Sequence, residues 1–504
     1  MKILKFTTIL MLFSVLVLAQ EKKKEGTKPV PKGEVSVTKH TAKINGKSIN
    51  YTVTAGTLLL RNGEDEGIAL YGFTAYTKDG VIDSKSRPIT FAYNGGPGSS
   101  SIWLHMGALG PKRTKVNDPT YTKNSPYELV DNNFSIIDVT DLVMVDPVGT
   151  GLSHAVGEAK NKDFWGVDQD IKSVSQFIHQ YTTENDRWNS PKYLLGESYG
   201  TMRNAGVVNY LQETYNMSMN GVIMVSAVFD IRTLRFAQGD DISYILNLPT
   251  YAAVAWYHHK VPNQPDDLNS FLDEARSFAK GEYATALMKG DGITDSEKNS
   301  LMSKLTYFTG LSKEYLLKAN LRVTEPEFTQ ELLRDDHKTV GRLDARFIGI
   351  NQDLLSQGAR FDPQSSAIGP AYKATFMDYY YNQLKVNKKL TYHVSAYGRK
   401  GFNWDWKHRS NRGFFPGSAN TGVDMAQALS RNPYLKILIL NGYYDLATPF
   451  YGVEYTIDHL ELEPEIKKNI IMEYFEAGHM TYVHEPSLAK FKSVVANFIQ
   501  STSK

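Results

Sequence analysis

The alternation of apolar and polar positions divides the chain into a β-rich beginning and a longer body of mixed character. Between residues 35 and 90, β-rich stretches are separated by dipeptides that tolerate positive φ angles and favour hairpins. These dipeptides are Asn45-Gly46, Asn62-Gly63 and Asp79-Gly80. We therefore expect an antiparallel β-meander in this part of the chain.

Beyond the meander, short apolar runs alternate with longer amphipathic stretches, which is typical of an α/β protein with a mostly parallel sheet covered on both faces. The predicted strands are residues 89–93, 142–146, 193–195, 222–226, 435–440 and 470–475. Between the second and third strands, apolar residues recur at helical spacing and predict a helix. Its predicted buried face is Val167, Ile171, Val174, Ile178 and Tyr181. We expect its charged residues, Asp168, Asp170 and Lys172, to face solvent.

Residues 229–416 break this alternation, since they are rich in Tyr, Leu and Lys and mostly helical in pattern. We interpret them as an inserted cap, which divides the main domain into residues 35–228 and 417–504. Residues 20–34, rich in Lys, Glu, Gly and Pro, predict a flexible linker. Near the end of the cap, the aromatic residues of the segment 401–406 either line a substrate pocket or pack the cap onto the body.

The first 19 residues are typical of a cleavable secretion signal. Lys2 and Lys5 precede an apolar run over residues 6–18, and the small Ala19 follows it. An uncleaved anchor is the alternative, but the run is shorter than the roughly 20 residues that span a bilayer. We therefore expect an exported protein, periplasmic or secreted, with no stable membrane insertion after cleavage.

The charge and the cysteine content exclude some classes of partner and of catalytic chemistry. Lys and Arg number 56 against 54 Asp and Glu, for a net charge of +2 without a basic block, so nucleic acid is not an expected partner. The absence of cysteine excludes disulfides and a thiolate nucleophile, and it favours a bacterial setting. His258-His259 and His484-Glu485 lack the spacing of a zinc motif, so we interpret them as surface or packing residues. With no nucleotide-binding motif either, we expect no metal and no cofactor.

The strongest local signal is Gly196-Glu197-Ser198-Tyr199-Gly200, a G-x-S-x-G run. It follows the predicted strand 193–195 and precedes a helical stretch over residues 202–213, which is the context of a nucleophile elbow. The glycines let the sharp turn pass close to neighbouring backbone. Ser198 would then be exposed at the start of a helix.

A serine hydroxyl needs a base to accept its proton and an acid to orient that base. Asp445 follows the predicted strand 435–440, and His479 follows the strand 470–475. Both positions lie beyond the carboxyl ends of strands, where α/β enzymes gather catalytic groups. The chain order of serine, acid and histidine is that of the α/β-hydrolase fold. The 247 residues from Ser198 to Asp445 (445 − 198) leave room for the cap.

A glycine-rich segment, residues 94–101, follows the strand 89–93 in the place where this fold supplies part of its oxyanion hole. Glycine there lets a backbone N–H approach the developing negative charge. A tight polar turn without catalytic function is the alternative.

Together these residues resemble the serine carboxypeptidases, the family of carboxypeptidase Y and cathepsin A. The matching stretches run over residues 91–225 and 434–484 and include the segments around Ser198, Asp445 and His479. The resemblance implies that Ser198 is the nucleophile, His479 the general base and then acid, and Asp445 its orienting partner.

Further roles are implied by the same resemblance. The backbone N–H groups of Gly96 and Tyr199 would form the oxyanion hole. Asn94, Gly95 and Glu197 would bind the free carboxylate of a peptide substrate, with Glu197 protonated because two carboxylates would otherwise repel. Activity on peptides should therefore be better at acidic pH.

The chain also departs from the family pattern, since the family's disulfides are absent, residues 230–412 show no resemblance, and two short segments differ. Gly200-Thr201-Met202-Arg203 replaces Ala-Gly, an aromatic residue and Pro, and Thr481-Tyr482 replaces Val-Pro. Arg203 either pairs with a nearby structural group or neutralises Glu197 or the substrate carboxylate. We expect a serine-type carboxypeptidase. The alternatives are an esterase or acyltransferase with the same triad, and a non-catalytic peptide-binding protein. The sequence is also compatible with a homodimer.

Overall fold

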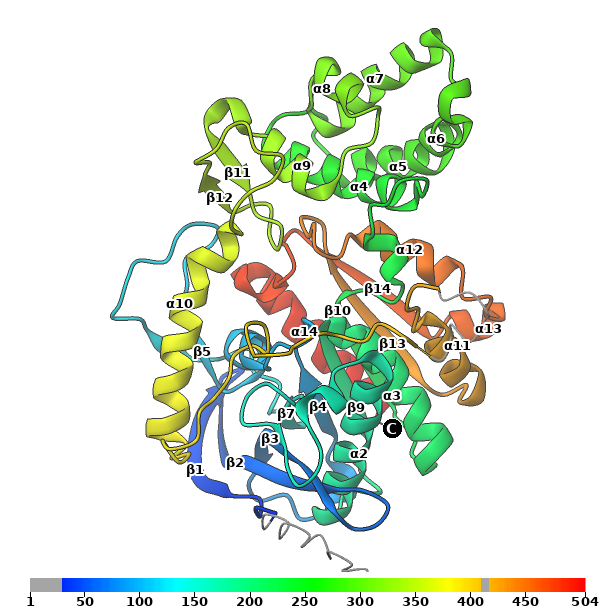
Figure 1. Ribbon diagram of the computed structural model, residues 1–504. Helices are drawn as coiled ribbons and strands as arrows, with labels where there is room; N and C mark the ends of the chain where they lie inside the picture. The colour runs from blue at the N-terminus through cyan, green and yellow to red at the C-terminus, as the bar shows by residue number, and fades with distance from the viewer. Residues whose placement is uncertain (1–29, 409–416, 504) are drawn as a thin grey trace, which may run out of the picture.

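The structure is a computed structural model that describes residues 30–408 and 417–503. The predicted signal peptide over residues 1–19, most of the predicted linker and the predicted boundary at residue 416 lie outside the described residues. The remaining elements can be followed along the chain in Figure 1.

One sheet of ten strands forms the centre of the described chain, in the order β1-β2-β3-β7-β4-β9-β10-β13-β14, with the short β8 paired to β3. The meander strands β1 to β3 are antiparallel and β3 joins β7 antiparallel, whereas all pairs from β7 to β14 are parallel. The meander comprises β1 (Val35–Ile44), β2 (Lys47–Arg61) and β3 (Gly67–Lys78). The others are β4 (Ile89–Tyr93), β7 (Asp141–Asp146), β8 (His154–Ala155), β9 (Lys192–Ser198), β10 (Gly221–Ala227), β13 (Lys436–Gly442) and β14 (Ile470–Phe475). The meander and the mostly parallel sheet are both as predicted.

Two hydrophobic clusters cover the two faces of this sheet, because successive residues of a strand point to opposite sides. In β13, Ile437 and Ile439 join the cluster under the helices α2, α3 and α11, whereas Leu438 and Leu440 join the cluster under α14. These helices are α2 (Val167–Glu184), α3 (Tyr199–Tyr215), α11 (Gly422–Arg431) and α14 (Glu485–Thr502). The parallel strands are therefore buried on both sides, as their continuous apolar runs predict.

One prediction for α2 is wrong. Asp168 and Lys172 are exposed as expected, but Asp170 is buried and forms an ion pair with Arg203 of α3. Because α2 and α3 pack side by side, the position of Asp170 faces a helix and not solvent. A second ionic contact ties α2 to α11, since His408 lies 2.6 Å from both Asp168 and Asp424.

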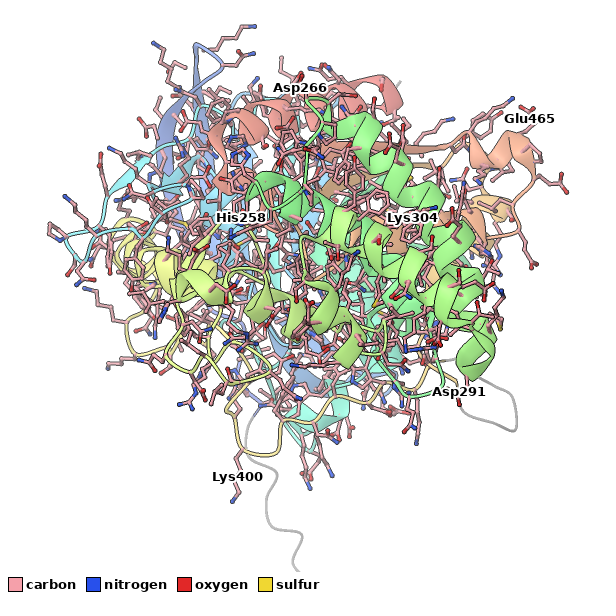
Figure 2. The ribbon with its side chains drawn as sticks, turned by 90° about the horizontal axis from the view of Figure 1, so that it is seen from above. His258, Asp266, Asp291, Lys304, Lys400 and Glu465 are labelled. Carbon is pink, nitrogen blue, oxygen red and sulfur yellow. The ribbon has the colours of Figure 1, made fainter. Side chains whose placement is uncertain are left out.

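A mostly helical layer lies over the carboxyl ends of the strands (Figure 1), and from above its helices cross the body (Figure 2). It has a hydrophobic cluster of its own. The helix α10 (Pro363–Asp378) lies beside the body, where Ile368, Tyr372 and Phe376 join the cluster under α14 (Figure 1). The helices of the layer are α4 (Ile242–Tyr257), α5 (Leu268–Phe278), α6 (Ala284–Lys289), α7 (Asp295–Thr309), α8 (Lys313–Lys318) and α9 (Glu325–Glu331). The layer also contains an antiparallel pair, β11 (Lys338–Val340) and β12 (Ile348–Ile350), which the helical pattern did not predict.

Several shorter elements lie between these. They are α1 (Ile102–Leu104), β5 (Lys112–Thr114), β6 (Leu129–Asp131), α12 (Phe450–Asp458), α13 (Pro464–Lys467) and a 3-10 turn at Thr481–Val483. None of the helices in the described residues combines the length and the apolar character needed to cross a membrane.

Candidate active site

The turn that carries Ser198 joins the end of β9 directly to the start of α3. Ser198 has φ 61° and ψ −132°, an unusual conformation for a residue with a side chain. A Cβ atom added to Gly196 would lie 2.3 Å from the carbonyl oxygen of Gly200. Glycine at position 196 is therefore required for the sharp turn that the G-x-S-x-G pattern predicts.

Asp445 and His479 lie on the loops that follow the adjacent strands β13 and β14. The Nδ1 atom of His479 lies 2.8 Å from Oδ2 of Asp445. The other oxygen of Asp445 accepts hydrogen bonds from the backbone N–H groups of Ala447 and Thr448, at 2.8 and 3.0 Å. A carboxylate held in this way fixes the imidazole with Nδ1–H toward Asp445 and leaves Nε2 as a proton acceptor.

The electrostatic environment of His479 suits a base. Burial alone lowers the pKa of the imidazole. The negative charge of Asp445 and its hydrogen bond raise this pKa by more than burial lowers it. The net effect is a raised pKa, so the protonated form of His479 is stabilised when it accepts a proton.

Ser198 and His479 line one cavity of about 370 Å³, whereas Asp445 is fully buried behind His479. Within the part of the chain that the structure describes, no hydrogen bond joins Ser198 to His479. The structure thus brings the three predicted residues into one region, with the acid and base in contact and the serine facing the same cavity as the base.

The loop after β4 packs against the start of α3. A Cβ atom on Gly95 would lie 2.4 Å from the backbone nitrogen of Tyr199, and Gly96 has φ +109°. Gly96 and Tyr199 both line the cavity that contains Ser198. The two segments expected to supply the oxyanion hole therefore meet beside the serine.

Asn94 and Glu197 form a hydrogen-bonded pair next to Ser198. Both side chains are buried, and Nδ2 of Asn94 donates to Oε1 of Glu197 at 2.9 Å. Burial raises the pKa of the Glu197 carboxyl to about 7, although the charge of His479 opposes this rise. Together with Gly95, these residues line the cavity, so all three expected carboxylate-binding residues lie together.

Tyr482 is a member of this site that the sequence marked only as a departure from the family pattern. Its hydroxyl donates to Oε2 of Glu197 at 2.7 Å, and its side chain is fully buried. No motif signals this contact, because the two residues lie 285 positions apart in the chain.

Arg203 pairs with a structural group and makes no contact with Glu197 among the described residues. Its side chain is fully buried, and Nε donates to Asp170 at 2.7 Å. Nη1 donates to the backbone carbonyl of Asn94 at 2.9 Å. The guanidinium also stacks over the ring of Tyr199, 5.4 Å from its centroid. Arg203 therefore supports Asn94 and Tyr199 from behind the cavity.

The aromatic segment 401–406 both lines the cavity and packs onto the body, so neither of the two interpretations is sufficient alone. Trp406 lines the cavity, and its ring lies edge-on to Tyr199 at 5.9 Å. Phe402 packs against Trp165 at 5.0 Å, on the loop before α2.

The sequence model of the serine carboxypeptidase family matches residues 50–481. The chain belongs to the serine carboxypeptidase family. A curated relative, serine carboxypeptidase-like 29 of Arabidopsis thaliana, is 25% identical over 163 residues. That match spans 31% of this chain and 31% of the plant protein.

Among solved structures, this chain is similar to Kex1(delta)p, a prohormone-processing carboxypeptidase from Saccharomyces cerevisiae. The TM-score is 0.55, with 16% sequence identity over 90% of this chain and 92% of the yeast chain. At this identity the likeness supports the fold, which is that of an α/β hydrolase.

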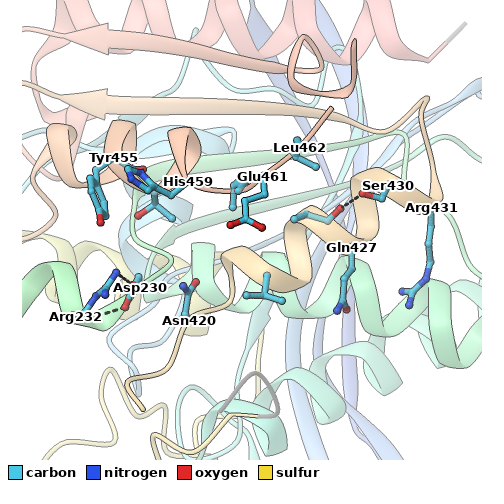
Figure 3. A pocket seen from close by; sticks show the side chains of 14 residues that line it. Asp230, Arg232, Asn420, Gln427, Ser430, Arg431, Tyr455, His459, Glu461 and Leu462 are labelled. Carbon is cyan, nitrogen blue, oxygen red and sulfur yellow. Dashed lines mark hydrogen bonds and ion pairs between the residues drawn. The ribbon is translucent and has the colours of Figure 1, made fainter. Parts of the chain in front are cut away.

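A second cavity, about 610 Å³ in volume, lies between α11 and α12. Its lining includes Arg232, His459 and Glu461 (Figure 3), and none of the three predicted triad residues is among the described residues around it. It is therefore separate from the cavity that holds Ser198.

No cluster of three or more His, Asp or Glu side chains in the described ranges is arranged to hold a metal ion. At His258-His259 and His484-Glu485, a histidine of each dipeptide hydrogen-bonds within the protein. His258 contacts the carbonyl of Ala345 at 2.6 Å, and His484 contacts Ser487 at 2.8 Å.

Proposed function

We propose that this protein is a serine-type carboxypeptidase that releases single amino acids from the carboxyl ends of peptides. The observation that carries the proposal is the buried Glu197, hydrogen-bonded to Asn94 on the wall of the cavity that Ser198 and His479 also line. A general hydrolase would gain nothing from burying a carboxyl group at this place, because burial of an ionisable group is costly.

The reaction begins when Nε2 of His479 accepts the proton of the Ser198 hydroxyl and Oγ attacks the carbonyl carbon of the last peptide bond. The carbonyl oxygen becomes an oxyanion, which the N–H groups of Gly96 and Tyr199 stabilise. His479 then gives the proton to the departing amino group, and the C–N bond breaks to leave an acyl ester on Ser198. Water, deprotonated by His479, hydrolyses the ester and restores the hydroxyl. Asp445 holds the imidazole throughout.

Recognition of the substrate's carboxylate requires donors and no nearby negative charge. Asn94 and the N–H of Gly95 supply donors, and Glu197 supplies one more when it is protonated. Since the pKa of Glu197 is raised to about 7 by burial, the carboxyl is neutral below that pH and ionised above it. Binding of a free carboxylate should therefore weaken as pH rises through 7.

The test compares a blocked dipeptide that has a free carboxyl end with the same dipeptide as an amide. The proposal expects turnover of the first to exceed that of the second, and expects Ser198→Ala to abolish both. Equal turnover of the two would favour the esterase or acyltransferase alternative. Failure of an organophosphonate probe to label Ser198 would favour a non-catalytic peptide-binding protein.

We also propose that the protein is exported, through the signal predicted at residues 1–19, and acts on peptides in the periplasm or outside the cell. Amino-terminal sequencing of the mature protein tests this, since a chain that still begins at Met1 would contradict it.

We propose as well that the chain is divided into a main domain and a cap at residues 229–416.

A further inference from the structure

We infer that Tyr482 sets the pH range over which this site accepts a free carboxylate, by hydrogen bonding to Glu197. This inference rests on the proposed function, because it assigns a positioning residue to the carboxylate-binding group of that reaction. It concerns a position where the chain departs from the family pattern.

The two oxygens of Glu197 have different partners. Oε1 accepts from Nδ2 of Asn94, and the orientation of that amide is fixed because its own oxygen accepts from the N–H of Leu104 at 3.0 Å. Asn94 can therefore only donate to Glu197. The hydroxyl of Tyr482 can rotate, so it can donate to an ionised Oε2 and also adapt when Oε2 carries a proton.

This difference decides where the proton of Glu197 lies. A proton on Oε1 would face the donating amide of Asn94, so the proton of Glu197 favours Oε2. Oε2 is also the oxygen that the Tyr482 hydroxyl contacts, at 2.7 Å. The hydroxyl stabilises the ionised form of Glu197 by a charge-assisted hydrogen bond. Burial of Glu197 acts in the opposite direction, and the pKa of about 7 results from the two effects together with nearby charges.

The ring of Tyr482 is held in place by the backbone beneath it. A Cβ atom on Gly107 would lie 2.4 Å from Cε2 of Tyr482, so only glycine lets the ring approach this closely. Phe491 of α14 packs edge-on to the ring, with centroids 6.4 Å apart. The hydroxyl therefore has a fixed position relative to Glu197.

Other groups around Glu197 also influence its charge. Asp445 and His479 face it from the loops after β13 and β14, and Tyr372 approaches from α10. Arg342 lies on the wall of the same cavity. Tyr482 and Asn94 are the side chains with hydrogen bonds to the Glu197 carboxyl among the described residues.

The experiment measures kcat/KM against pH for the blocked dipeptide with a free carboxyl end, using the full chain. Tyr482→Phe removes only the hydroxyl, so the ionised form of Glu197 loses a stabilising bond. The alkaline fall in activity should move upward by about one pH unit, since a hydrogen bond to a charged group is worth roughly that much. Tyr283→Phe is the matched control and should leave the midpoint unchanged, because Tyr283 is a buried tyrosine of the helical layer that hydrogen-bonds to the carbonyl of Leu321, away from the cavity.

Incorporation of 3-fluorotyrosine at position 482 supplies the opposite perturbation and nearly preserves the shape of the ring. Its more acidic hydroxyl is a stronger donor, so the midpoint should move downward, and this measurement decides the question if Tyr482→Phe does not fold. An unmoved midpoint in either folded variant, or a shift of the wrong sign, overturns the inference. A wild-type enzyme that turns over acid and amide substrates equally would instead contradict the proposed function itself.

Discussion

Replacement of Glu197 by glutamine is a sharp test of the carboxylate-binding role, because it keeps the shape and removes the titration. Oε1 accepts from Asn94, so the amide oxygen of the variant should occupy that place. The NH2 group then takes the position of Oε2, facing Tyr482. Glu197→Gln therefore presents a hydrogen-bond donor at every pH.

The size of the pH dependence of kcat/KM follows from the pKa of Glu197, which burial raises to about 7. About half of the carboxyl groups are protonated at pH 7 and about 1% at pH 9, because each unit is a tenfold change. The wild-type kcat/KM for a free-carboxylate peptide should thus fall about 50-fold between these pH values. The variant should change by less than about threefold over the same range, since nothing at position 197 titrates.

The assay follows release of the carboxyl-terminal amino acid from a blocked dipeptide between pH 5 and pH 9. Glu158→Gln, at an exposed position away from the cavity, is the matched control and should follow the wild-type profile. If Glu197→Gln keeps the alkaline fall with the wild-type midpoint, Glu197 is not the group that controls recognition.

Three further predictions concern the supporting residues. Asp445→Asn should lower kcat by about 10⁴-fold with little change in Tm, because an amide would favour the wrong tautomer of the catalytic imidazole; a smaller loss than tenfold would contradict its role. Arg203→Met should lower the free energy of unfolding by about 3–5 kcal/mol, measured by urea denaturation, since it leaves the buried Asp170 without its partner; Arg203→Met with Asp170→Leu should recover part of this, and no recovery would refute the pairing argument. Desolvation lowers the pKa of His408, but the carboxylates of Asp168 and Asp424 raise it to about 9 overall. The stabilisation of the folded state by protonated His408 is therefore complete below about pH 6.5 and is lost as pH rises through 9. Unfolding experiments should show a loss of about 2 kcal/mol over that range, allowing for solvent screening, and His408→Gln should flatten it.

The central sheet was largely predictable, because each parallel strand is a continuous apolar run bounded by turn residues. The bounds of β4 and β14 agree with the predicted residues 89–93 and 470–475. The helix α2 was also predicted, but the burial of Asp170 was not. Periodicity assigns a charged residue to the solvent side unless its partner is known, and here the partner lies 33 residues away on another helix.

The positions of Ser198, Asp445 and His479 could be predicted because each lies at or just beyond the carboxyl end of a strand of the same parallel sheet, and these ends meet at one edge. The contact between Tyr482 and Glu197 could not, since a phenol has no characteristic spacing and the contact depends on the tertiary approach that Gly107 permits. The β11–β12 pair was missed for a related reason. Its strands are three residues long and lie inside a helical pattern. Three residues are too few to establish the alternation of apolar and polar positions that marks a strand.

The most direct measurement of the central claim uses one peptide in two forms, with a free carboxyl end and with an amidated end. Mass spectrometry should show the free peptide shortened by one residue at a time from its carboxyl end, while the amidated peptide stays intact and Ser198→Ala leaves both unchanged. Internal cleavage, equal loss of the two forms, or shortening that persists in Ser198→Ala would contradict the account.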